Sequence, residues 1–470
     1  MSSFVRSMKV TRRTALAGAG ASALGAVIAA ACGQATVMTE EAPKEEMKEE
    51  APKAEATAMP EIETATIAMI SAEKPTTRPV LEPILADFTE QMPHIAVDLV
   101  PSGGWGEVRT KFYAAQAAGD PINIMENGWS AVLTTFETGV TIDLAPFFTR
   151  DKIDPAATFA APAINMWTVE GRILGMPITM SVDSMAYNVE IFEAAGINPL
   201  PVDLNDTDWN METLLDLSTQ LTNEDRTQFG HGGGITCSNG GGIGTGTFWG
   251  VGPWDSEEGR ATIDTPEFID ALDWWRDFGD KHRVTPNADE REAAMGGQSG
   301  NVFMSGKVAM QLTCTSFRDA PFTWALATMP YSGEGPSQSG RTWTHPLQMA
   351  DDGTDQNDLS WELFKWLLQP ENGGRYPPSA GHVVSPLLDD NASTLAQDGY
   401  KNSLGVDPRA FLLHSRTTKP AGWGLWTFTE FGDISGDLNG QYREFLAGNL
   451  TAAEYARWAA DLINETLGGK

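Results

Sequence analysis

Apolar residues recur along the chain at two different spacings, and the order of these spacings predicts the fold class. Alternating apolar positions predict strands over 64–70 and 95–99, and a short apolar run predicts a third strand over 122–125. Helical spacing predicts helices over 80–91 and 107–118. Strands that alternate with helices form parallel βαβ units, so the sequence predicts an α/β fold.

The later part of the chain carries helix signals and glycine-rich breaks. Asn210 and the string Thr451–Glu454 predict helix N-caps, and Thr265-Pro266 predicts another helix start. Residues 359–368 have the apolar spacing of a further helix. We expect loops in the two glycine-rich stretches, 232–234 and 240–252.

The first 60 residues differ in pattern from the rest. Arg12 and Arg13 precede an apolar stretch that is too short and too rich in Gly and Ala for a membrane span, and that ends in Ala29-Ala30-Ala31-Cys32. Residues 1–31 are therefore expected to be an export signal of twin-arginine type with a lipobox, and Cys32 the lipidated residue. A plain cleaved signal with an incidental cysteine is the alternative. Residues 32–60, which are rich in Glu, Lys, Ala and Pro, are expected to be an acidic, disordered tether.

Charge narrows the class of partner. The 470-residue chain has a formal net charge of −31, and removal of the four basic residues before Cys32 would lower it to −35. A surface this acidic repels nucleic acid and anionic lipid, so the sequence favours a neutral or cationic small molecule as partner.

The sequence lacks the local signatures of catalysis and of metal binding. It contains no Gly-x-Ser-x-Gly elbow and no phosphate-binding Gly-x4-Gly-Lys-[Ser/Thr] loop, and its six histidines are not at metal-ligand spacing. We therefore expect no metal and no cofactor. Cys237 and Cys314 could form one disulfide bond or remain two buried thiols.

Several strings in a fixed order resemble the extracellular solute-binding lipoproteins of ABC importers, in particular the sugar-binding family 1. Their order and spacing over most of the chain carry the resemblance, because each string alone is weak. The strings are 92–97 (MPHIAV), 119–121 (GDP), 169–177 (VEGRILGMP), 187–188 (YN), 191–197 (IFEAAGI), 303–310 (FMSGKVAM), 361–367 (WELFKWL) and 448–451 (GNLT). The chain departs from the family pattern at Ile122-Asn123, where Asp is usual, and in its glycine-rich stretch.

The resemblance implies a two-lobed periplasmic-binding-protein fold of type II with a ligand cleft between the lobes. The chain would cross between the lobes near 176–182 and 331–342. The implied N-terminal lobe comprises 61–178 and 340–400, and the C-terminal lobe comprises 179–339 and 401–470.

The implied function is that of the substrate-binding component of an ABC transporter. As a monomer that catalyses no reaction, the protein would capture a carbohydrate outside the cell and deliver it to the importer's membrane subunits. It would be held at the outer face of the cytoplasmic membrane by its N-terminal lipid only. The alternatives are a binding protein for a non-sugar solute and a lipid-anchored glycoside hydrolase, which needs only two carboxylates placed by the fold.

Candidate ligand residues follow from the need of a sugar site for aromatic rings that stack and polar groups that bind hydroxyls. Loop tryptophans are the main candidates, and the resemblance adds an aromatic residue after strand 308–310. The residues expected at the ligand are Glu73, Lys74, Asn127, Trp129, Asp183, Trp249, Phe317, Trp343, Trp423 and Trp426. Packing between loops is the alternative for each aromatic residue, and capping of backbone amides is the alternative for Asp183. Tryptophans on helical stripes are expected in the core: Trp274, Trp275, Trp361, Trp366 and Trp458.

The lipobox-like string predicts that Cys32 anchors the mature protein. Cys32→Ala should move the protein from the membrane fraction to the exported soluble fraction, because the lipid is the expected anchor. Fractionation and an intact-mass measurement on the wild type test this. An unchanged distribution, or a wild-type mass without an added acyl chain, would contradict it.

Overall fold

The structure, a computed structural model, describes most of the chain after residue 63. The described residues are 64–72, 78–128, 132–233, 240–255, 257–297, 300–314, 316–331, 341–351, 356–379, 384–415, 419–420, 425 and 430–467. The chain divides into two units, residues 1–60 and 61–470, and all described residues belong to the second. The expected export signal, the tether and Cys32 lie outside the described residues.

The first sheet contains the predicted βαβ units. Its strands are β1 (Ala65–Ile70), β2 (Ile95–Val100), β3 (Ile124–Glu126), β6 (Met176–Val182), β13 (Arg341–Met349) and β14 (Lys419–Pro420). Their order is β14-β13-β3-β1-β2, and β6 also pairs with β13. Strands β2 and β3 run parallel to β1 on its two sides.

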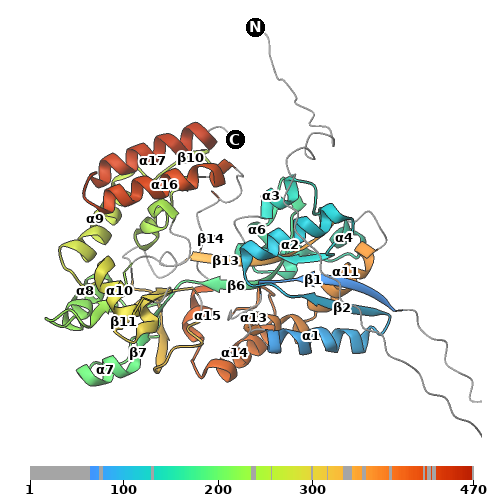
Figure 1. Cartoon of the computed structure of the whole chain (residues 1–470), viewed down its shortest axis with the longest axis horizontal. Coiled ribbons are helices and arrows are strands. Elements are labelled where there is room, and N and C mark those ends of the chain that lie inside the picture. The colour runs from blue at the N-terminus through green and yellow to red at the C-terminus, as the bar shows by residue number, and fades with distance from the viewer. Residues whose placement is uncertain are drawn as a thin grey trace, which may run out of the picture. The chain divides into compact units, whose positions relative to one another are not determined.

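Helices cover both faces of this sheet. Helix α1 (Arg78–Gln91) connects β1 to β2, and α2 (Trp105–Ala118) connects β2 to β3 on the other side of β1. Because such connections are right-handed, the two helices must lie on opposite faces, as Figure 1 shows. The other helices of this region are α3 (Val132–Glu137), α4 (Ala145–Arg150), α5 (Pro155–Thr158), α6 (Ala161–Asn165), α11 (Gln356–Leu367), α12 (Pro370–Gly373), α13 (Tyr376–Ser379), α14 (Asp390–Leu404) and α15 (Arg409–Ser415).

A second sheet has the strand order β12-β7-β11-β8. Its strands are β7 (Ser184–Asn188), β8 (Phe229–His231), β11 (Val308–Thr313) and β12 (Trp324–Ala327). Strand β11 runs parallel to β8 and antiparallel to β7. The helices around it are α7 (Val189–Ala195), α8 (Met211–Gln220), α9 (Pro266–Asp280), α10 (Ala288–Met295), α16 (Glu430–Leu446) and α17 (Ala452–Leu467). Two small ribbons complete the strands: β4 (Thr168–Val169) with β5 (Arg172–Ile173), and β9 (Trp254–Asp255) with β10 (Arg260–Ala261).

Two antiparallel strands connect the sheets. Strand β6 belongs to the first sheet and is separated from β7 of the second sheet by Asp183 alone. Its partner β13 pairs Thr342 with Val182 and Leu347 with Met176. The first crossing was expected at these residues, whereas the second crossing strand begins only at the end of the range expected for it. The division into lobes at the residues given above stays a prediction.

Local signals account for the helix starts that the sequence predicted. The Asn210 side chain accepts hydrogen bonds of 3.0 Å from the amides of Glu212 and Thr213. The Thr451 hydroxyl accepts one of 3.2 Å from the amide of Glu454, whose carboxylate accepts one of 2.9 Å from the amide of Thr451. These contacts bond backbone amides that have no partner within the helix.

The expectation of a simple loop over 240–252 was wrong for residues 240–249. They form two 3-10 helices, Gly240–Gly242 and Thr245–Trp249, and the first packs against α16. Gly241 has a φ of 66°, and a Cβ there would lie 2.5 Å from the Cβ of Leu438. Glycine is therefore required by the left-handed backbone and by close packing, and not by a loop.

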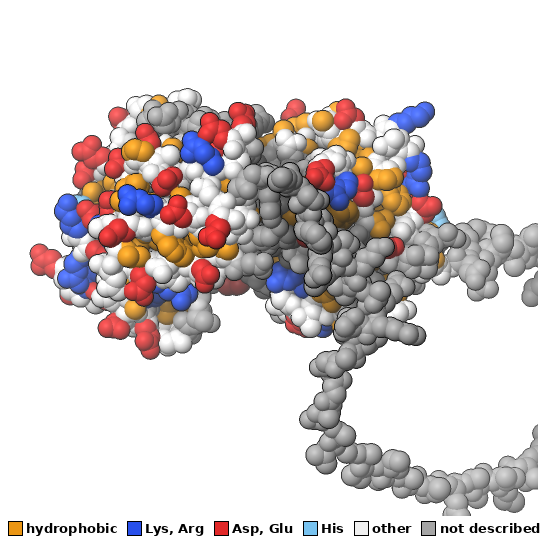
Figure 2. All heavy atoms as spheres, turned by 90° about the horizontal axis from the view of Figure 1, so that it is seen from above, with side chains coloured by type: hydrophobic (Ala, Val, Ile, Leu, Met, Phe, Trp, Pro, Cys, Tyr) orange, Lys and Arg blue, Asp and Glu red, His pale blue; other side chains and the backbone are white. Residues whose placement is uncertain are grey.

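The surface fits the acidic composition. Acidic side chains are spread over the face seen in Figure 2, with basic ones between them. None of the helices in the described ranges is both long and apolar enough to cross a bilayer.

Truncation of Trp275 should destabilise the fold. Its buried ring packs against Phe248 and Phe278, with centroid distances of 5.3 and 5.4 Å. Trp275→Ala should lower the free energy of unfolding by roughly 3 to 5 kcal/mol, because a cavity replaces the ring. Urea unfolding measures the loss, and Trp458→Ala, at a partly exposed position on α17, is the matched control. Equal losses of unfolding free energy in the two variants would contradict the assignment of Trp275 to the core.

Candidate functional site

Polar and aromatic residues gather at one edge of the first sheet. Strands β1, β2 and β3 are parallel, so their carboxyl ends meet at the same edge. In open α/β sheets, ligands bind at this edge. The residues there include Ser71 after β1, Ser102 after β2, and Glu126 and Asn127 at the end of β3.

Glu126 is a buried carboxylate at this edge, with a side chain that is 4% exposed. The Tyr376 hydroxyl donates a 3.0 Å hydrogen bond to Oε2 of Glu126, and His345 Nδ1 lies 4.0 Å from Oε1. Burial raises the pKa of Glu126 to about 7, although hydrogen bonds from Tyr376 and Ser71 act in the opposite direction. This carboxyl group can therefore change charge near neutral pH.

The Trp105 ring contacts the ring of His345, which in turn lies next to this carboxylate. The partly buried ring meets the His345 ring edge to face, with centroids 4.6 Å apart. Gly128 lies against the indole, since a Cβ there would be 3.4 Å from the ring. Strand β13 thus brings His345 to a site built otherwise by β3 and α2.

The second region has its own aromatic pocket, with a volume of about 430 Å³. Trp249 lines it and packs against Trp274, with centroids 5.7 Å apart. The other lining residues are Thr207, Asn210, Met211, Glu212, Phe248 and Tyr331. Indole rings beside a carboxylate are the side chains that a sugar site needs.

Several residues expected at the ligand are buried in the protein interior. Asp183 is buried between β6 and β7. Trp343 packs in a cluster with Met166, Trp167 and Cys314. Phe317 packs against Phe303 and Trp324, with centroid distances of 4.7 and 5.6 Å. Their contact with ligand stays a prediction.

The structure brings Asn127 to the sheet edge beside Glu126 and places Trp249 in the pocket of the second region. The other five expected ligand residues lie outside the described residues: Glu73, Lys74, Trp129, Trp423 and Trp426. Of the two alternatives for Cys314, a disulfide bond or a buried thiol, the structure has the disulfide bond.

The other two cysteines, Cys32 and Cys237, lie outside the described residues. Across the described part of the chain, no group of three His, Cys, Asp or Glu side chains could hold a metal ion.

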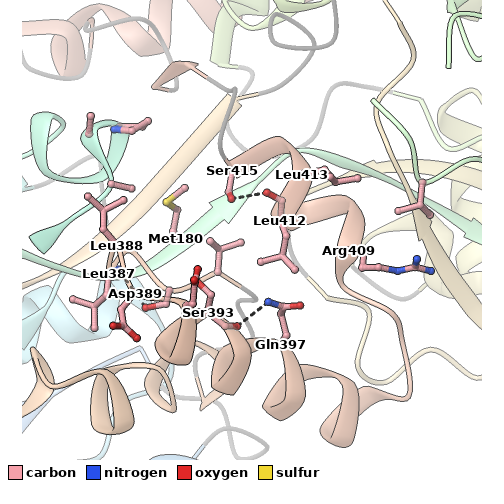
Figure 3. A pocket seen from close by; sticks show the side chains of 17 residues that line it. Met180, Leu387, Leu388, Asp389, Ser393, Gln397, Arg409, Leu412, Leu413 and Ser415 are labelled. Atoms are coloured by element: carbon pink, nitrogen blue, oxygen red, sulfur yellow. Dashed lines mark hydrogen bonds between the residues drawn. The ribbon is translucent and has the colours of Figure 1, made fainter. Parts of the chain in front are cut away.

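A larger pocket of about 940 Å³ lies between α6, α14 and α15 (Figure 3). Met180 of β6 forms part of one wall. Polar side chains in it bond to their own helices: Gln397 donates to the Ser393 carbonyl at 3.1 Å, and Ser415 donates to the Leu412 carbonyl at 2.7 Å. These two side chains therefore each make a hydrogen bond within the protein.

Glu126, Trp105, His345 and Tyr376 were not among the residues expected at the ligand. Glu126 begins the string 126–129 that follows the predicted third strand, but Asn127 and Trp129 were the residues chosen from it; the strand was expected to end at Met125, whereas β3 ends at Glu126. The position of Glu126 next to Asn127 was the available signal. No local signal points to His345 and Tyr376, because they reach the site from the far end of the chain.

The model of the bacterial extracellular solute-binding protein family matches residues 73–374. A binding protein of Brucella abortus strain 2308 is 22% identical over 379 residues, which cover 76% of this chain and 84% of that protein.

Solved structures share the fold at low sequence identity. An ABC substrate-binding protein of Listeria monocytogenes in complex with cycloalternan has a TM-score of 0.67 and 20% identity, covering 87% of this chain and all of that one. The cyclic α-maltosyl-1,6-maltose binding protein of Arthrobacter globiformis has a TM-score of 0.68 and 13% identity, with 87% and 100% covered. UgpB of Mycobacterium tuberculosis in complex with glycerophosphocholine has a TM-score of 0.68 and 15% identity, with 86% and 98% covered. The predicted two-lobed α/β fold is confirmed.

The raised pKa of Glu126 predicts a specific pH dependence of stability. The folded state binds this proton more tightly than the unfolded state, so the contribution is fully present below pH 4.5 and is lost as pH rises through about 7. Relative to Glu126→Gln, the wild type should lose roughly 3 kcal/mol of unfolding free energy over this interval.

Urea unfolding of both proteins between pH 4.5 and 8 measures the difference. His231 and His414, whose pKa values burial lowers to about 3, act in both proteins and cancel. Parallel pH profiles for the two proteins would contradict the prediction.

Proposed function

The chain belongs to the bacterial extracellular solute-binding protein family, and from this premise we propose that it captures an extracellular carbohydrate for an ABC importer. Its further partners are the importer's membrane subunits. The family is extracellular, so the chain is an exported protein. We also propose that residues 1–31 direct export and that lipid on Cys32 holds the monomeric protein at the membrane.

The observation that carries the proposal is that Trp105 and Glu126 both lie next to His345 at the carboxyl edge of the first sheet. An indole face stacks on the C–H groups of a sugar ring, and a carboxylate accepts hydrogen bonds from its hydroxyl groups. Structural neighbours in complex with cycloalternan and with maltotriose support a carbohydrate.

Recognition would use groups from both lobes. Trp129 would stack from the first lobe, and Trp249 and Trp426 from the second. A solute that contacts both lobes stabilises the closed state over the open one, because only the closed state makes both sets of contacts. The protein itself would change no covalent bond in the solute, in keeping with a family and neighbours that are binding proteins.

A non-sugar solute with a cationic group is the second candidate. A carboxylate beside an indole also binds ammonium groups, and the neighbour UgpB is in complex with glycerophosphocholine. The two candidates differ in charge, so a solute panel that contains both kinds separates them.

The soluble protein should bind at least one member of a panel of mono- and oligosaccharides. A ligand at 100 times its dissociation constant adds roughly 2.7 kcal/mol of stability, which a thermal shift detects. Trp129→Ala, Trp249→Ala and Trp426→Ala should each weaken binding of that sugar about ten- to hundredfold while the fold survives.

Calorimetric titration measures these affinities, and Trp458→Ala is the matched control that should bind like the wild type. Wild-type affinity in all three loop variants would overturn the site assignment. Binding of glycerophosphocholine but of no sugar would replace the carbohydrate by the second candidate. Product release from an oligosaccharide over time would indicate a hydrolase instead.

A further inference from the structure

A buried amide network lies directly behind the candidate site. Its centre is Gln348 on β13, whose side chain is fully buried. Its Nε2 group is in hydrogen-bond contact with three acceptors: the Leu174 carbonyl at 3.0 Å, the Val132 carbonyl at 3.2 Å and the Thr141 hydroxyl at 3.3 Å. These acceptors belong to three segments that are not neighbours in the sequence.

Asn127 joins this network to the end of β3. Its Nδ2 group donates to Gln348 Oε1 at 2.7 Å and to Thr135 Oγ1 at 2.8 Å. Its backbone amide donates to the Pro346 carbonyl at 3.0 Å. Asn127 is therefore held to β13 through both its backbone and its side chain.

The network fixes the described residues on both sides of segment 129–131. On one side are Asn127 and Gly128, which packs on the Trp105 ring. On the other side, Val132 and Thr135 belong to the first turn of α3. Both sides are bonded, directly or through Asn127, to the one carboxamide of Gln348.

Stability alone is a weak reason for such a network. Asn127 Oδ1 is buried and has no hydrogen-bond partner among the residues that the structure describes. An incompletely satisfied buried network is less stable than a well-packed apolar core. The hydrogen bonds of the network do, by contrast, fix the backbone of Gly128 relative to β13. Because Gly128 packs on the Trp105 ring, they fix the position of that ring as well.

We propose that Gln348, acting through Asn127, is a positioning residue for the binding site. It holds Asn127, Gly128 and the start of α3 in the geometry that the solute meets, without touching the solute itself. This inference rests on the proposed function, and its decisive test uses protein without ligand.

The test compares two buried side-chain amides, that of Gln348 on β13 and that of Asn123 immediately before β3. Gln348→Met removes the network while keeping the length of the side chain. Asn123→Ala is the matched control, because Asn123 is buried before β3, donates to Gln356 Oε1 at 2.6 Å and accepts from the Ala68 amide at 2.8 Å. Thr135→Val, which removes the hydroxyl that accepts from Asn127, is a milder second variant should Gln348→Met fail to fold.

The readouts are the fluorine NMR signal of 5-fluorotryptophan at Trp105, assigned with Trp105→Phe, and amide exchange of residues 126–128 and 132–136. Gln348→Met and Thr135→Val should shift the Trp105 signal and speed exchange in both segments, whereas Asn123→Ala should leave them as in the wild type. With the panel sugar that the wild type binds, Gln348→Met should weaken affinity about tenfold.

An unchanged Trp105 signal in Gln348→Met and Thr135→Val, or an equal change in Asn123→Ala, would overturn the positioning role. Unchanged affinity despite a shifted signal would overturn it as well. Failure of the wild type to bind any solute would count against the proposed function and would leave the ligand-free result to decide the positioning role.

Discussion

The pairing of β13 with its neighbours is the constraint on which the rest of the structure depends. This strand is hydrogen-bonded to β3, β6 and β14. With β6 it forms the two-stranded connection between the sheets. It also pairs with β3, whose end carries the candidate site. A shift of one residue in its register would turn His345 and Gln348 to the wrong faces, since side chains alternate along a strand. The register of the pairing with β6 shifts between His345 and Pro346, where β6 contains one extra residue, Ile178.

The carboxyl edge of the first sheet holds Glu126, whose ionised form is disfavoured by its surroundings. Burial of Glu126 disfavours ionisation more than the Tyr376 and Ser71 hydrogen bonds favour it. Natural proteins tolerate such groups mainly at sites of function, where a solute supplies the missing interactions. A sugar hydroxyl or a cationic group near Glu126 would favour the ionised form and lower its pKa, so solute binding and proton release would be linked.

The sequence was sufficient for the βαβ units because each of their signals is local. Apolar spacing predicted β1, α1, β2 and α2, and Asn210 and Thr451 marked helix starts that the structure confirms. Prediction from the sequence failed where the local structure depends on residues that are distant along the chain. Gly241 packs beneath Leu438, and its carbonyl accepts a hydrogen bond from the Tyr455 hydroxyl. Nothing within the glycine-rich stretch reveals those partners, just as nothing near Glu126 reveals Tyr376.

The aromatic candidates show the same limit. Phe317 follows β11 at a position where exposure and burial give the same local pattern, and its neighbours Phe303 and Trp324 decide in favour of burial. Trp249 follows a glycine-rich sequence and remains partly exposed, although it packs against the rings of Trp274 and Phe248.

The energetics of closure explain why both regions would have to contribute. A solute that moves a two-state equilibrium from 1:99 to 99:1 must bind the closed state more tightly by about 5.5 kcal/mol. One stacked ring contributes roughly 0.5 to 1.5 kcal/mol beyond its buried area, and one net hydrogen bond contributes about 1 kcal/mol. The Trp105 and Glu126 edge alone supplies too little, and contacts present in both states add nothing to the difference. We therefore propose that groups of the second lobe, such as those of the Trp249 pocket, contact the solute only on closure, while β13 keeps the first-lobe groups fixed.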